Sequence, residues 1–181
     1  MKKDNQDLPQ RKHPRLKEYD YSQQGAYFIT ICTQDRRCLL SHIVGRGLAP
    51  AETAEVKYTV FGRIAEQQLL LLEQRYSHLK IDKYVIMPDH IHAILILKET
   101  AGARGPRNEL VSFGVRSPRP TLTDIVCAYK SLTTRECIRN GFSGKLFQTS
   151  FYEHIIRDDR DYDEVTKYIS ENPMRRQNDY N

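Results

Sequence analysis

Apolar positions along this chain follow two different periods, which divide it into predicted strands and helices. Four stretches rich in β-branched and aromatic residues are typical of strands: 26–34, 79–87, 90–97 and 146–157. In three other stretches apolar residues recur every three or four positions, which predicts amphipathic helices at 55–76, 121–141 and 158–176. Thr121 is a helix N-cap signal, and Pro173 is expected to end or bend the last helix.

The order of these elements predicts an α+β fold. Strand, helix, strand, strand, helix, strand is the ferredoxin-like split βαβ arrangement, an antiparallel sheet with helices on one face, and here a C-terminal helix follows. Pro88-Asp89 is a turn signal that pairs 79–87 with 90–97 as a hairpin. We expect a basic N-terminal arm at 1–24, one domain at 25–181, and mobile insertions at 43–54 and 99–120, where Gly, Pro and Arg interrupt every periodic pattern.

Two histidines at the start of the third strand are the first candidate site. His90 and His92 are one residue apart, so both side chains point to one face of the sheet, close enough to bind one cation. A strand that is expected to be central would hold them rigidly. The alternative is that each histidine ends the strand and bonds to the loop, and the motif alone does not decide between the two.

A tyrosine on the last predicted helix is the second candidate. Tyr168 and Asn172 are four residues apart, so a phenol and an amide are stacked on one helix face. If this face meets the histidines, a composite site is formed. The alternative is that Tyr168 continues an apolar stripe with Val165 and Ile169 and packs in the core.

Composition and charge add a weak indication of nucleic acid. The chain has 181 residues, 39% hydrophobic and 28% charged, which suits a soluble domain, and its net charge of +5 is spread over several clusters. The polar N-terminus has no apolar segment of the length expected for a signal peptide or membrane span, and the four cysteines form no CxxC pair. We therefore expect a cytoplasmic protein that does not enter a membrane.

Three segments resemble a known family. "YVIMPDHIHAIL" and "FQTSFYEHIIRDDRDYDEVTKYISENPMRR" resemble the signature regions of IS200-like (Y1) transposases of the HUH superfamily, and "RLKEYDYSQQGAYFITICTQDRRCLL" resembles the N-terminus of the REP-associated tyrosine transposases. The resemblance implies a single-strand DNA endonuclease and strand transferase with an IS200-like transposase domain. It also implies that the substrate is single-stranded or hairpin DNA, such as a REP-like palindrome.

The resemblance also assigns roles to individual residues. It implies that His90 and His92 bind a divalent metal, that Asn172 is the third metal ligand, and that Tyr168 is the nucleophile that forms a 5′-phosphotyrosine. Nitrogen and neutral oxygen ligands suit Mn²⁺, whereas Mg²⁺ would be chosen for its abundance. His154 matches a recurrent family histidine, either near the site or as a hydrogen-bonded strand residue.

Basic and aromatic residues at the ends of the predicted elements are candidates for DNA contacts, because cations follow the phosphate backbone and aromatic rings stack on bases. They are Arg11, Lys12, Arg15, Lys17, Tyr19, Tyr21, Arg36, Arg37, Arg175 and Arg176.

Two other function classes are weighed against the transposase. A noncatalytic nucleic-acid-binding ferredoxin-like module would bind without metal and form no covalent adduct. A metal hydrolase would use a metal-bound water, and too few acidic residues accompany the histidines for that. Nothing in the sequence decides between a monomer and a homodimer.

Overall fold

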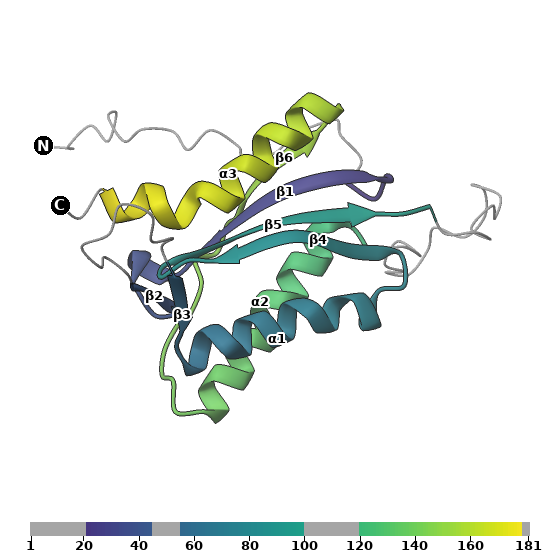
Figure 1. Cartoon of the computed structure of the whole chain (residues 1–181). Helices are drawn as coiled ribbons and strands as arrows, with labels where there is room; N and C mark the ends of the chain where they lie inside the picture. The colour runs from purple at the N-terminus through teal and green to yellow at the C-terminus, as the bar shows by residue number, and fades with distance from the viewer. Residues whose placement is uncertain (1–20, 45–54, 100–119, 179–181) are drawn as a thin grey trace, which may run out of the picture.

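The centre of the protein is a four-stranded antiparallel sheet (Figure 1). The computed structural model describes residues 21–44, 55–99 and 120–178, with side chains described up to residue 173. The strand order is β4 (Leu79–Ile86), β5 (His90–Leu97), β1 (Gly25–Cys32) and β6 (Tyr152–Ile156). The predicted α+β class, the antiparallel sheet, the hairpin at Pro88-Asp89 and the central position of β5 are confirmed.

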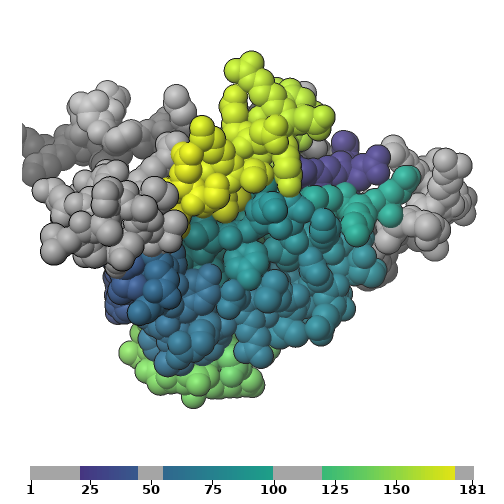
Figure 2. All heavy atoms as spheres, in the orientation of Figure 1, coloured from purple at the N-terminus to yellow at the C-terminus, as the bar shows by residue number. Residues whose placement is uncertain are grey.

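Helices cover both faces of this sheet. Helices α1 (Val60–Arg75) and α2 (Leu122–Arg139) lie on one face, and α3 (Asp159–Asn178) lies across the other (Figure 1). Figure 2 shows the same layering in space-filling form, with α3 as a ridge on one side and α2 on the opposite side.

Side chains alternate between the two faces of the sheet along each strand, and the apolar ones form a separate core on each face. In β1, Tyr27, Ile29 and Ile31 belong to the large core cluster with α1 and α2. The intervening Phe28 belongs to a smaller cluster with Ile94 and Ile169, under α3. The small cluster therefore attaches the C-terminal helix to the face of the sheet that carries His90 and His92.

The first predicted helix begins too early. Glu55–Tyr58 is strand β3, which pairs with β2 (Ser41–Val44), and α1 begins only at Val60. Thr59 is the N-cap, because its side chain accepts a hydrogen bond from the Gly62 backbone N–H. The prediction of an insertion over 43–54 is likewise wrong at its first two residues, which belong to β2.

Other boundaries also differ from the prediction. The first strand ends at Cys32, followed by a short 3-10 turn, η1 (Gln34–Arg36), and the last strand is only five residues long. The predicted N-cap Thr121 is confirmed at α2, where it forms a capping box with Asp124. Pro173 does not end α3, which continues to Asn178; a proline removes one helical hydrogen bond without forcing the helix to stop.

Most of the predicted N-terminal arm and of both insertions lies outside the described residues, so the structure does not test these predictions. Within the described ranges, no helix has the length and apolar character needed to cross a membrane.

Candidate functional site

The two histidines lie side by side in the middle of the sheet. His90 and His92 are at the start of β5, between β4 and β1, and both rings face α3. Their ring centroids are 4.5 Å apart, with an angle of 70° between the planes. Only 5% and 4% of the two residues is exposed. The rings are therefore close enough, and sufficiently shielded from water, to share one ligand.

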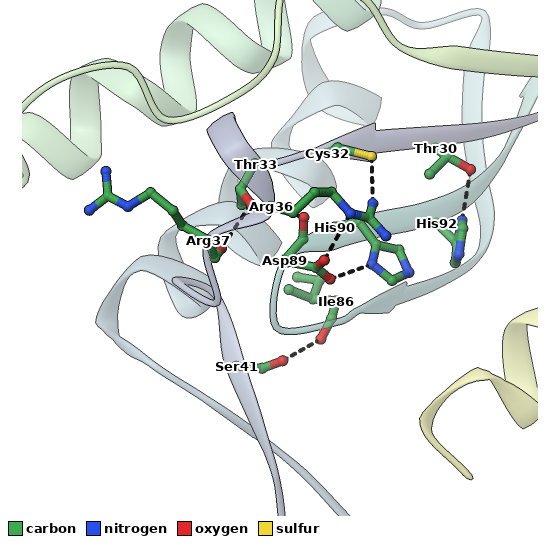
Figure 3. Close-up of polar contacts among 10 residues, drawn as sticks. All are labelled: Thr30, Cys32, Thr33, Arg36, Arg37, Ser41, Ile86, Asp89, His90 and His92. Carbon is green, nitrogen blue, oxygen red and sulfur yellow. Dashed lines mark hydrogen bonds and ion pairs between the residues drawn. The ribbon is translucent and has the colours of Figure 1, made fainter. Parts of the chain in front are cut away.

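Each histidine has its Nδ1 engaged by a neighbour (Figure 3). Nδ1 of His90 is 2.7 Å from Oδ1 of Asp89, and Nδ1 of His92 is 2.8 Å from the hydroxyl oxygen of Thr30 on β1. An ionised carboxylate can only accept, so His90 must be the donor to Asp89. A neutral His90 therefore carries its proton on Nδ1 and its lone pair on Nε2, and His92 has the same arrangement when its Nδ1 donates to Thr30.

His92 has the properties of a neutral metal ligand. Burial, assisted by the nearby His90 and Arg36, lowers the pKa of His92 to about 3, so the ring is neutral at physiological pH. Its Nε2 is buried and has no hydrogen-bond partner among the residues that the structure describes. Because buried polar atoms are normally satisfied, this nitrogen fits a site for an ion.

Tyr168 lies beside the histidines and not in the core. Its ring centroid is 5.1 Å from that of His92 and 6.0 Å from that of Phe28, while 38% of the residue is exposed. The predicted apolar stripe is formed instead by Val165 and Ile169, which pack in the small cluster. The phenol therefore stands at the border between the histidine pair and solvent, within one chain.

Asn172 lies one helical turn beyond Tyr168 and is 7% exposed. In the described ranges, no three His, Cys, Asp or Glu side chains are grouped so that they could hold a metal ion. Among the described side chains, a third ligand for the histidine pair would then be of another type, and an amide oxygen on the same face of α3 as Tyr168 suits that role.

Two polar contacts attach the beginning of α3 to opposite edges of the sheet. On β6, His154 Nε2 is 2.8 Å from Oδ1 of Asp161. On β4, Asp82 accepts a hydrogen bond from the Tyr162 hydroxyl, and Asp82 lies at a bulge of that strand. His154 is thus hydrogen-bonded to α3, which agrees with the reading of a satisfied strand histidine.

The predicted DNA-contacting residues are only partly described. Arg36 and Arg37 are exposed, and Arg36 is bound to Asp89, whereas Tyr21 is partly buried with its ring 6.3 Å from that of Tyr27. The rest of the set lies outside the described side chains: Arg11, Lys12, Arg15, Lys17, Tyr19, Arg175 and Arg176.

Sequence reasoning missed three polar residues that support the site. Thr30 contacts His92 from 62 positions away, and Asp82 contacts Tyr162 from 80 positions away, so no local pattern could indicate either. Asp89 could have been found, because a carboxylate beside a candidate metal-binding histidine is a common orienting partner.

Comparison with known proteins places the chain in context. No protein-family model matches it. It is 30% identical over 173 residues to an uncharacterized protein of Haemophilus influenzae, covering 94% of this chain and 92% of that protein. The two proteins belong to one family.

A solved structure identifies the fold. The structure of a REP-associated tyrosine transposase bound to a REP hairpin superimposes with a TM-score of 0.58 and 20% identity, over 90% of this chain and 74% of that one. The chain has the fold of a REP-associated tyrosine transposase. The resemblance found in the sequence is thus confirmed at the level of the fold.

Proposed function

We propose that this protein is a DNA transposase of the tyrosine type, a single-strand endonuclease and strand transferase. The observation that carries the proposal is the position of Tyr168, whose ring lies 5.1 Å from His92 on the same face of the sheet as His90. A potential nucleophile and a potential metal site are therefore adjacent in one chain.

The nucleophilic step is assigned to Tyr168. Its oxygen attacks the scissile phosphorus, a P–O bond to the phenol forms, and the P–O bond to the 3′ oxygen breaks. The phenol loses its proton as it attacks, and the departing 3′ oxygen takes up a proton. The product is a 5′-phosphotyrosine and a free 3′ hydroxyl, so the energy of the phosphodiester bond is kept for the later joining of a strand.

The proposed metal is Mg²⁺ or Mn²⁺, held by His90, His92 and Asn172. Such an ion would neutralise negative charge on the non-bridging oxygens of the phosphate. The protein side chains prepare its site: Asp89 and Thr30 hold the imidazoles in place, and burial keeps His92 uncharged. Three neutral ligands add no negative charge, which suits an anionic substrate.

The proposed substrate is single-stranded DNA or a hairpin. The superimposed transposase is bound to a REP hairpin, and the net charge of +5 favours a polyanion. Because Tyr168 is partly exposed, an extended strand could reach it without displacing the core.

The test is the formation of a covalent adduct. The full chain is incubated with single-stranded and hairpin oligonucleotides in Mg²⁺, Mn²⁺ or a chelator, and the products are separated under denaturing conditions. We expect a protein–DNA adduct that requires the metal. DNA binding without an adduct under any of these conditions would instead indicate a noncatalytic binding module, and cleavage without an adduct would indicate a metal hydrolase.

A further inference from the structure

The two adjacent arginines after β1 have different surroundings (Figure 3). The Arg37 side chain points away from the histidines, is exposed, and makes no hydrogen bond or ion pair within the described residues. The Arg36 guanidinium turns toward them: its Nε is 3.0 Å from Oδ2 of Asp89, and its Nη1 is 2.8 Å from the sulfur of Cys32.

Asp89 connects Arg36 to the histidine pair. The carboxylate is 1% exposed, with Oδ1 on His90 and Oδ2 on Arg36. A buried carboxylate needs a charged or hydrogen-bonding partner at each oxygen to be tolerated. The contact of Oδ2 with Arg36 therefore orients the carboxylate so that Oδ1 lies against Nδ1 of His90.

The backbone around Arg36 supports a specific role. Asp35 and Arg36 both have φ of 55°, a left-handed conformation that non-glycine residues rarely adopt. Two consecutive residues in this conformation are maintained only where the surroundings require it, and such positions gather at functional sites. Here the turn brings the Arg36 guanidinium back over the Asp89 carboxylate.

We propose that Arg36 is a positioning residue for the proposed metal site: it holds Asp89 so that this carboxylate fixes His90 in the tautomer with the proton on Nδ1 and the lone pair on Nε2. Arg37, in contrast, remains a candidate for a phosphate contact. The inference rests on the metal-binding part of the proposed function. It also gives different roles to Arg36 and Arg37, which the sequence analysis treats together as candidates for DNA contacts.

The experiment measures Mn²⁺ binding to the full-length protein without DNA, by the electron paramagnetic resonance signal of free Mn²⁺. Outer partners of ligating histidines commonly change metal affinity by about 10- to 100-fold. We expect Arg36→Gln and Asp89→Asn to weaken Mn²⁺ binding by at least about tenfold. The matched control Arg37→Gln should bind Mn²⁺ like the wild type but bind DNA with a weaker dependence on salt.

A second measurement needs no metal. Nitrogen NMR of the imidazoles reports which ring nitrogen of His90 carries the proton. The wild type and Arg37→Gln should show His90 protonated at Nδ1, whereas Arg36→Gln should show a mixture of both tautomers. Arg36→Lys, which keeps the charge but loses the fork of donors, should be intermediate. Thermal unfolding of each variant confirms that the proteins compared are folded.

The outcomes separate this inference from the proposed function. Unchanged Mn²⁺ affinity and an unchanged His90 tautomer in folded Arg36→Gln would overturn the role of Arg36 while leaving the transposase proposal intact. If the wild type binds no Mn²⁺, the proposed metal site is wrong, and the tautomer measurement alone decides whether Arg36 positions His90.

Discussion

The ring of Tyr168 lies 5.1 Å from the ring of His92, and Phe28 of β1 lies against both. Phe28 stacks on His92 with centroids 5.2 Å apart and meets the edge of Tyr168 at 6.0 Å. One buried aromatic side chain therefore sets the distance between the proposed nucleophile and the proposed metal ligand.

Replacing Phe28 should damage the site more than the fold. Phe28→Leu is expected to lower the free energy of unfolding by about 1–2 kcal/mol and to slow adduct formation at least tenfold, because Tyr168 and His92 lose their common support. The control is Phe142→Leu: Phe142 is equally buried, 7% exposed, but belongs to the core on the other side of the sheet. Single-turnover kinetics well below the melting temperature compare the two variants, and equal rates would contradict the role of Phe28.

Thr30 should matter for metal binding although it is not a proposed ligand. Thr30→Val keeps the shape of the side chain but leaves Nδ1 of His92 without its 2.8 Å partner. We expect a loss of about 1–3 kcal/mol in stability from the unsatisfied nitrogen and a loss of Mn²⁺ affinity of roughly tenfold. Calorimetric titration with Mn²⁺ measures the change in affinity, and denaturant unfolding measures the change in stability. Wild-type affinity in Thr30→Val would show that the bond does not orient His92.

The contacts that attach α3 to the sheet should contribute less to the stability of the fold at acid pH. The hydrogen bond from Tyr162 holds the pKa of Asp82 below its usual value of 3.8. At Asp161 partial burial acts in the opposite direction, but the bonds from His154 and from the Arg157 backbone outweigh it and lower that pKa as well. A depressed carboxylate pKa stabilises the folded state above about pH 4, and this contribution is lost as the pH falls below 3.8 through the folded-state pKa.

Tyr162→Phe isolates the Asp82 contribution. We expect it to be less stable than the wild type by about 1–2 kcal/mol above pH 5, with a difference that shrinks below pH 3.8. Adduct formation should slow, because α3 carries Tyr168. Tyr84→Phe removes a similar bond to Glu66 on the opposite face of β4 and should leave adduct formation unchanged. Denaturant unfolding at a series of pH values measures the stability difference between Tyr162→Phe and the wild type. A difference that stays constant down to pH 2.5 would contradict the role of Asp82.

The sequence predicted those parts of the site that depend on local pattern. Alternation in β5 placed His90 and His92 on one face, and the i, i+4 spacing placed Tyr168 above Asn172. The contacts that orient these groups, from Thr30, Asp82 and Phe28, join strands and helices far apart in the chain, and no periodicity encodes them.

The fold shows the same division. The sheet, its hairpin and the capped α2 follow local signals, whereas the helical spacing of Val56 and Val60 wrongly predicts a helix over β3. Pairing with β2 overrides that spacing, and α1 begins only at Val60, after its N-cap Thr59. The position of α3 on the face opposite α1 and α2 depends on the small Phe28 cluster, which only the assembled sheet creates.

The central claim is that Tyr168 is the residue that becomes covalently linked to DNA, and mass spectrometry of the digested adduct tests it most directly. The account predicts a nucleotide phosphate on the peptide containing Tyr168, loss of the adduct with retained DNA binding in Tyr168→Phe, and a normal adduct in the control Tyr152→Phe, another exposed tyrosine of the domain. An adduct that persists in Tyr168→Phe, or a phosphate located on any other residue, would contradict it.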